Sequence, residues 1–284
     1  MIRIGPSSND ILFYEQGHKS SKEAPAWLAK MGLNAYEISF GRGIRVGEQT
    51  AREIGDQAKQ HGIAISTHAP YYINLASTDP QKVQNSYNYI KRSLVALNWL
   101  GGNRLIVHLG AQGDLTREQA VQNCKINLKT VLTLLDEDKE INFDFLLCIE
   151  TMGRYKWIGD VEEILDICQI DDRVVPCLDF GHVNAWKQGE LKRKPELVAT
   201  IMDEVLKSLG KEKMRNLHIH FSHIIYGKNG EYKHTNLSDD AWSVPFIPLA
   251  KWLKENKFTP TIICESQDVM AQDAVRLKKQ YEDA

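Results

Sequence analysis

The sequence predicts an α/β protein with the (β/α)8 TIM barrel fold, formed by residues 1–284 as a single domain. Three observations predict this fold: short apolar runs recur along the chain, amphipathic stretches separate these runs, and no linker or break in composition divides the chain. The runs are residues 2–8, 35–40, 63–70, 104–110, 145–151, 174–182, 216–222 and 261–266. A doubly wound open sheet is the alternative, but no G-x-G-x-x-G motif follows the first run.

The segments between the runs predict the surrounding helices. Residues 21–32 lie between the first two runs, and residues 81–102 lie between the third and fourth. In the second segment apolar residues recur near helical spacing, and Gly101-Gly102 is a plausible helix C-cap. The run at 174–182 begins with five residues typical of a buried strand and then reaches Asp179 and His182.

Composition indicates a folded protein with a sizeable core. The chain is 43% hydrophobic and 25% charged, with a net charge of −2, so overall basicity gives no argument for nucleic-acid binding. A local basic groove is still compatible with that average. Five cysteines without a C-x-x-C pair argue against a disulfide framework. With no apolar signal region and no membrane-length apolar stretch, we expect a cytoplasmic protein that has no membrane association. The sequence indicates no protein partner.

Six successive predicted strands end in residue types that bind metal ions. In (β/α)8 barrels the active site lies at the C-terminal ends of the strands. One histidine or carboxylate there is more often a cap or an ion-pair partner, but six in succession favour a shared metal site, because such groups are costly to bury unpaired. These residues are His68, His108, Glu150, Asp179, His182, His220 and Glu265, with His234 in the loop after the seventh strand.

The donor types indicate the metal and the reaction. Imidazole and carboxylate together suit Zn²⁺, or Mn²⁺ and Fe²⁺. Five histidines and three carboxylates exceed what one ion needs, so we expect two or three ions. A multinuclear site favours phosphodiester hydrolysis, because the ions activate water and stabilise the attacking and leaving oxygens.

Four neighbouring residues are interpreted differently. Cys148 and Cys177 lie two residues before Glu150 and Asp179, so we expect them to fill the barrel one layer deeper. His218 lies one layer below His220 and is a better candidate for a supporting histidine than for a ligand. His223 faces either the site or solvent.

Short motifs in the chain resemble the endonuclease IV family of apurinic/apyrimidinic endonucleases, within the wider xylose-isomerase-like barrels. The motifs are HAPYYINLAS (68–77), VHLG (107–110), CIETMG (148–153), CLDFGHVNAW (177–186) and CES (264–266). The resemblance implies a DNA-repair hydrolase that cleaves damaged double-stranded DNA at the phosphodiester 5′ to an abasic site. It also implies a trinuclear zinc site, with Mn²⁺ as a possible replacement.

Site residues follow from the resemblance position by position. His68 and His108 would bind the first ion, and Glu150 would bridge to a second ion completed by Asp179, His220 and Glu265. His182 and His234 would hold the third ion, and Glu150 or Glu265 would orient the nucleophile. The residues that would contact DNA are Arg42, Tyr71 and Tyr72. Packing of either tyrosine over the barrel mouth is an equal alternative.

The chain departs from the family after the seventh strand. The family's Asp-x-His for the third ion appears here as Tyr232-Lys233-His234, and Glu231 is a possible replacement carboxylate. Residues 238–246 contain two acids where the family has a glycine-rich segment, and the long loop at 223–246 is a possible lid.

Two other functions are compatible with the same residues. A sugar isomerase or epimerase would need one divalent ion, held by Glu150, Asp179, His220 and Glu265, with the two glutamates exchanging a proton. A barrel that binds a phosphorylated ligand without turnover is the third hypothesis. The number of metal ions per chain separates the first two.

Overall fold

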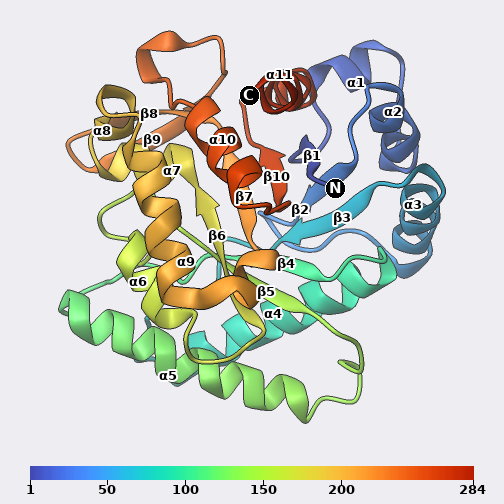
Figure 1. The fold of residues 1–284 in the computed structure, drawn as a ribbon. Helices are drawn as coiled ribbons and strands as arrows, with labels where there is room; N and C mark the ends of the chain where they lie inside the picture. Colours follow the sequence, from blue (N-terminus) through green and yellow to red (C-terminus); the bar gives the residue numbers. More distant parts are fainter.

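Eight parallel strands pair in the order β1-β10-β7-β6-β5-β4-β3-β2 in the computed structural model, which describes residues 1–284 (Figure 1). The strands are β1 (Arg3–Pro6), β2 (Ala35–Ser39), β3 (Ala64–His68), β4 (Arg104–Val107), β5 (Leu146–Glu150), β6 (Val174–Asp179), β7 (His218–Phe221) and β10 (Thr261–Cys264). A bridge between Ser7 and Glu37 joins the end of β1 to β2 and closes the barrel. Each predicted run contains one of these strands, so the predicted fold class is confirmed.

Helices surround the barrel, as Figure 1 shows. They are α1 (Ile11–Glu15), α2 (Ala24–Lys30), α3 (Glu48–His61), α4 (Pro80–Trp99), α5 (Arg117–Asp136), α6 (Val161–Ile167), α7 (Phe180–Trp186), α8 (Glu190–Arg193), α9 (Leu197–Arg215), α10 (Ile247–Glu255) and α11 (Met270–Asp283). Local sequence fixes several ends: Thr116 and Gln119 form a capping box at α5, and Gly101 has a φ of 72° just after α4. None of the helices combines the length and apolarity needed to cross a membrane.

The run predicted as a strand at 174–182 is shorter in the structure. Strand β6 ends at Asp179, and α7 begins at the next residue. The cause is the Asp179 side chain, whose Oδ1 accepts a hydrogen bond from the backbone N–H of His182 at 2.8 Å. Asp179 therefore acts as the N-cap of α7, and His182 lies on a helix instead of a strand.

The loop after β7 contains an antiparallel hairpin, formed by β8 (His223–Gly227) and β9 (Gly230–Thr235), which sequence reasoning missed. A 3₁₀ turn at Asp240–Trp242 follows it, and another at Ser21–Glu23 precedes α2. Backbone bonds dock the hairpin on the loop after β5, since the N–H of Glu231 donates to the carbonyl of Gly153 at 2.8 Å. At Gly230, with a φ of 86°, a Cβ would lie 2.0 Å from that carbonyl oxygen. Only glycine allows this approach.

The barrel interior changes character along its axis. Ile106, Cys148, Val175 and Cys177 form a small apolar cluster inside it, so both cysteines fill the barrel as predicted. All five cysteines are buried and free. Larger apolar clusters lie between the strands and the helices and hold the barrel's shape. Polar side chains occupy the interior toward the C-terminal ends of the strands.

Candidate metal centre

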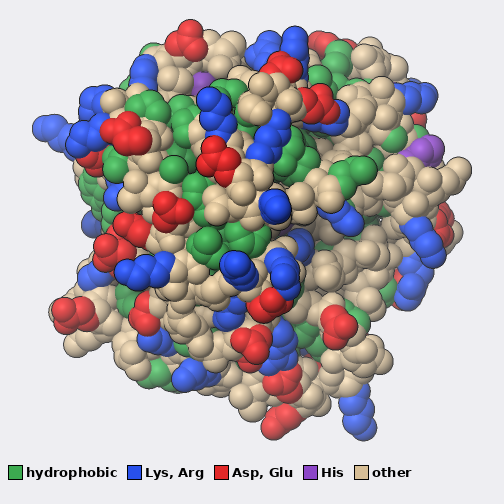
Figure 2. Space-filling view, in the orientation of Figure 1, with side chains coloured by type: hydrophobic (Ala, Val, Ile, Leu, Met, Phe, Trp, Pro, Cys, Tyr) green, Lys and Arg blue, Asp and Glu red, His purple; other side chains and the backbone are tan.

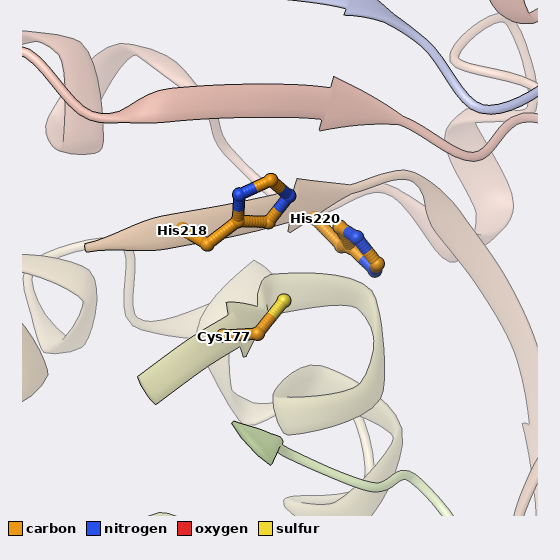
Figure 3. Close-up of side chains that lie close together, drawn as sticks. All are labelled: Cys177, His218 and His220. Atoms are coloured by element: carbon orange, nitrogen blue, oxygen red, sulfur yellow. The ribbon is translucent and has the colours of Figure 1, made fainter. Parts of the chain in front are cut away.

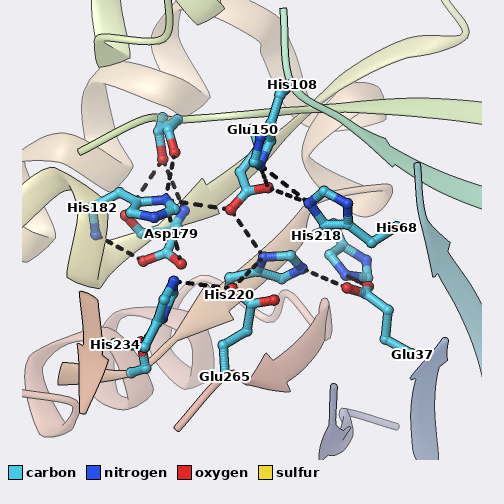
Figure 4. Close-up of polar contacts among 12 residues, drawn as sticks. Glu37, His68, His108, Glu150, Asp179, His182, His218, His220, His234 and Glu265 are labelled. Carbon is cyan, nitrogen blue, oxygen red and sulfur yellow. Dashed lines mark hydrogen bonds and ion pairs between the residues drawn. The ribbon is translucent and has the colours of Figure 1, made fainter. Parts of the chain in front are cut away.

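Three groups of histidines and carboxylates meet at the C-terminal end of the barrel (Figure 4). Within each group, one donor atom per residue lies within 4.8 Å of the others. The groups are His68, His108 and Glu150; Glu150, Asp179, His220 and Glu265; and His182, Glu231 and His234. All eight predicted ligands, together with Glu231, are therefore brought together.

The first group converges on one oxygen of Glu150. Its Oε2 lies 3.1 Å from Nε2 of His68 and 2.8 Å from Nε2 of His108, and the two nitrogens are 3.1 Å apart. On the far side of its ring, Nδ1 of His68 lies 2.8 Å from the carbonyl oxygen of Ala69. A carbonyl only accepts, so the proton belongs on Nδ1, and the Nε2 lone pair points into the group.

The second group is built around His220. Its Nδ1 lies 3.1 Å from Oε1 of Glu150 and 3.3 Å from Oε2 of Glu265. Asp179, at the end of β6, contributes Oδ2, which is buried without a hydrogen-bond partner. Glu150 belongs to both groups, one oxygen facing each, as a bridging carboxylate would.

The third group depends on a β-bulge in the hairpin. Glu231 pairs with Tyr226 and His234 with Ile224, so Tyr232 is an extra residue between them. The bulge places Glu231 and His234 on the same face of β9, although their spacing is one residue longer than Asp-x-His. Oε2 of Glu231 lies 3.3 Å from Nε2 of His182, and Oγ of Ser222 lies 2.8 Å from Nδ1 of His234. Glu231 therefore lies close to His182 and groups with His182 and His234.

The electrostatics of the centre call for positive charge. Burial lowers the pKa of His220, but the Cys177 thiol and the carboxylates of Glu265, Glu37 and Glu150 raise it well above the ordinary value. Burial also lowers the pKa of His182, but the carboxylates of Asp179, Glu231 and Glu150 outweigh burial. The pKa of His182 is therefore well above its ordinary value. Burial raises the pKa of Glu265, but His220 and His234 lower it to about 2. Anionic groups so close together need protons or metal cations between them, and the donor set fits divalent cations that accept nitrogen and oxygen.

A layer beneath the centre contains functional candidates that sequence reasoning missed. Glu37, on β2, is fully buried and contacts His218 and His220 of β7. Its single signal in the sequence is a carboxylate inside the apolar run 35–40. His218 is buried with its Nε2 3.1 Å from Oε2 of Glu37, and Figure 3 shows its ring beside Cys177 and His220. His223 is buried, with its Nδ1 3.1 Å from the carbonyl oxygen of Asp239.

A cavity of about 600 Å³ opens over the centre. Tyr71 lines it and stacks on His108 with 5.4 Å between ring centroids, so it packs over the barrel mouth while about half exposed. Tyr72 instead packs against Tyr89, and Arg42 is exposed outside the cavity lining. Sequence reasoning missed other lining residues, among them Arg154, Trp157, Lys233 and Gln267.

The fold and the clustered donors define a class, a parallel (β/α)8 barrel with a candidate metal centre at its C-terminal mouth. The chain belongs to the xylose isomerase-like TIM barrel family, whose model matches residues 25–281. This places it in an enzyme superfamily whose members differ in the reactions they catalyse.

Relatives and solved structures carry two kinds of names. The uncharacterized protein MJ0133 of Methanocaldococcus jannaschii is 33% identical over 254 residues, covering 89% of each chain. A probable endonuclease 4 of Mycoplasma pneumoniae is 26% identical over 189 residues, covering 64% of this chain and 62% of its own.

Among solved structures, endonuclease IV from Thermus thermophilus has a TM-score of 0.67 at 16% identity, covering 99% of this chain and 100% of that one. D-psicose 3-epimerase from Clostridium cellulolyticum, solved with D-tagatose, has a TM-score of 0.66 at 15% identity, covering 100% and 92%. At these identities the structural likeness demonstrates the fold alone.

Proposed function

We propose that the protein is a metal-dependent phosphodiesterase that hydrolyses the DNA backbone 5′ to abasic sites. The observation that carries the proposal is the number of donors: there are three adjacent groups, two of which share Glu150, where a single ion needs only one group. Relatives named probable endonuclease 4 support it. The proposed cations are two or three Zn²⁺, with Mn²⁺ as a substitute compatible with the same ligands.

The proposed ligands are divided among three ions in the same way as the three groups of side chains. His68 and His108 would hold one ion, Asp179, His220 and Glu265 a second, and His182, Glu231 and His234 a third, while Glu150 bridges the first two. Such ions supply Lewis-acid activation of water and of the phosphodiester. All the ligands except His108, Glu231, His234 and Glu265 are buried, so the protein fixes most of the donor geometry before substrate arrives.

Glu265 is the better of the two candidate catalytic carboxylates. Both line the cavity, but Glu150 is 1% exposed and surrounded by imidazoles, whereas the side chain of Glu265 is 16% exposed. A carboxylate at the cavity wall can accept a hydrogen bond from the attacking water and so orient it. We therefore assign orientation of the nucleophile to Glu265 and a bridging role to Glu150.

Cationic and aromatic side chains of the cavity suit a nucleotide substrate. Arg154 and Lys233 line the wall, and Arg154 lies 3.5 Å from Oε1 of Glu231. A guanidinium there can donate to phosphate oxygens. Tyr71 and Tyr232 are about half and three-quarters exposed, and either can stack on an unpaired base or wedge into a base step. Acidic and basic side chains are interspersed over the face in Figure 2, so we assign affinity for DNA to these local contacts.

One observation favours a second candidate, a sugar epimerase. Glu150, Asp179, His220 and Glu265 by themselves form one group, sufficient for a single divalent ion between two glutamates. The epimerase neighbours share the fold. In that function the other two groups would have no metal, and one Mn²⁺ or Co²⁺ per chain would be bound.

The test is an incision assay with a zinc count. The zinc-loaded protein is incubated with a duplex carrying one tetrahydrofuran abasic-site analogue, beside an undamaged duplex. Since the analogue cannot undergo β-elimination, a nick reports hydrolysis. Metal-dependent incision 5′ to the analogue, with two or three zinc ions per chain, is the expected result. A folded protein that binds metal and leaves the duplex intact would overturn the proposed substrate, and a single ion per chain would favour the epimerase.

A further inference from the structure

Glu37 is a buried carboxylate without a lysine or arginine partner. It is 0% exposed, and its Oε2 accepts a hydrogen bond from Oγ of Ser66 at 2.8 Å and lies 3.1 Å from Nε2 of His218. Its Oε1 lies 3.1 Å from Nε2 of His220, and neither of these two buried atoms has an aligned hydrogen-bond partner. A carboxylate in such surroundings costs several kcal/mol to bury unless its neighbours compensate it. We therefore expect its contacts with the two histidines to supply the compensating interaction.

The two ring nitrogens of His220 face different surroundings. Nε2 faces Glu37 from above, whereas Nδ1 faces Glu150 and Glu265 in the metal centre (Figure 4). A neutral imidazole has one N–H and one lone pair. Carboxylates that can only accept face both nitrogens of His220. When a cation takes the place of the proton on Nδ1, the N–H that remains is on Nε2 and faces Glu37. The lone pair on Nδ1 then points between two carboxylates, an arrangement that a cation stabilises.

We propose that Glu37 is a positioning residue, which fixes the tautomer and ring orientation of His220 so that Nδ1 is presented to a metal ion. The inference rests on the proposed function only in that the centre binds metal. Carboxylate–histidine–metal arrangements orient the ring and increase the basicity of the ligand. Ser66 and His218 hold the other oxygen of Glu37, so the carboxylate itself has little freedom to turn.

Another interpretation of this layer is a separate metal site. One donor atom each from Cys177, His218 and His220 lies within 4.8 Å of the others (Figure 3). However, Nε2 of His218 and Nε2 of His220 both contact Glu37, and burial raises the pKa of the Cys177 thiol well above its ordinary value, which opposes thiolate formation. We therefore assign Cys177 to packing, and its substitution separates the two interpretations.

The experiment compares Glu37→Ala and Glu37→Gln with the wild type, and Cys177→Ala is the matched control from the same layer. Zinc affinity is measured by chelator competition, and the His220 tautomer by ¹⁵N NMR of the zinc-loaded protein, assigned by the signal lost in His220→Gln. We expect Glu37→Ala to weaken zinc binding by about 10–100-fold. Glu37→Gln keeps an oxygen that can accept from Nε2–H, so we expect it to stay within a few-fold of wild type. Cys177→Ala should leave zinc binding unchanged.

Several results would overturn the proposal. Wild-type affinity in Glu37→Ala would do so, as would a proton on Nδ1 of His220 in the zinc-loaded wild type, a result that requires no variant to fold. Loss of one zinc ion in Cys177→Ala would make the layer a metal site itself. None of these readouts uses DNA, so failure to incise DNA would overturn the proposed substrate and leave the positioning role standing.

Discussion

Substitution of Glu150 by glutamine removes one charge from the centre at nearly constant shape. Its Oε2 lies 2.8 Å from His108 and 3.1 Å from His68, and its Oε1 lies 3.1 Å from His220. Opposite unit charges about 4 Å apart attract by roughly 4 kcal/mol at an effective dielectric constant of about 20. Since about 1.4 kcal/mol corresponds to a factor of ten, complete loss would weaken binding about 1,000-fold. Glutamine keeps one oxygen ligand, so we expect zinc affinity to fall by roughly 100- to 1,000-fold.

Incision should fall further than zinc occupancy, because Glu150 belongs to two of the three groups. We expect Glu150→Gln to lose at least about 1,000-fold in incision of the tetrahydrofuran duplex, even at saturating zinc. Zinc content, circular dichroism and initial rates are compared with those of Glu118→Gln, which removes an exposed carboxylate on α5. Near-wild-type incision by Glu150→Gln, with normal zinc content, would refute the bridging role.

Three further predictions concern proton competition, the third group and substrate binding. Nearby anionic groups raise the pKa values of His182 and His220 despite burial. In metal-free protein the positive charge of these two histidines therefore stabilises the fold, fully so below about pH 6.5. This contribution is lost as the pH rises through the raised pKa values of the two histidines. Zinc displaces these protons, so the zinc-induced increase in Tm should grow from about pH 6 to about pH 8; a shrinking increase would contradict this. His234→Ala should lower the zinc content by one ion per chain, and an unchanged content would show that the hairpin holds no metal. Arg154→Ala should raise KM for the duplex roughly 10- to 100-fold with little change in kcat, since a charged hydrogen bond contributes about 1.5–3 kcal/mol, and an unchanged KM would exclude phosphate contact.

The fold was predictable because its signal is local and repeated. Each barrel strand is a short apolar run, and Asp179 and Glu150 stand where such runs end. Because parallel strands place their C-terminal ends at one mouth, residues far apart in the chain could be predicted to meet there. For Tyr71 the sequence left DNA contact and packing over the mouth as equal alternatives, and its ring stacks on His108 at the mouth.

Other features depend on geometry with no local signal. The bulge at Tyr232 makes Glu231 and His234 share a face, and it arises from the pairing register of β8 and β9. Docking of the hairpin through Gly153 and Gly230 requires a close backbone approach that a motif does not reveal. Arg154 pairs with Gly230 of the docked hairpin and lines the cavity.

By itself, the sequence determined the barrel and its eight candidate ligands, because hydrophobic periodicity and the position of polar residues at strand ends are written along the chain. Only the tertiary structure decided how those donors divide into three groups, and that Glu231 joins them. It also decided that Glu37, which looks like a stray acid in an apolar run, lies directly beneath His220. The physical reason is that closure of the barrel places β2 beside β1, and the side chain of Glu37 on β2 then meets β7 across the interior. Such contacts depend on barrel closure and strand register, and not on residues that are neighbours in the sequence.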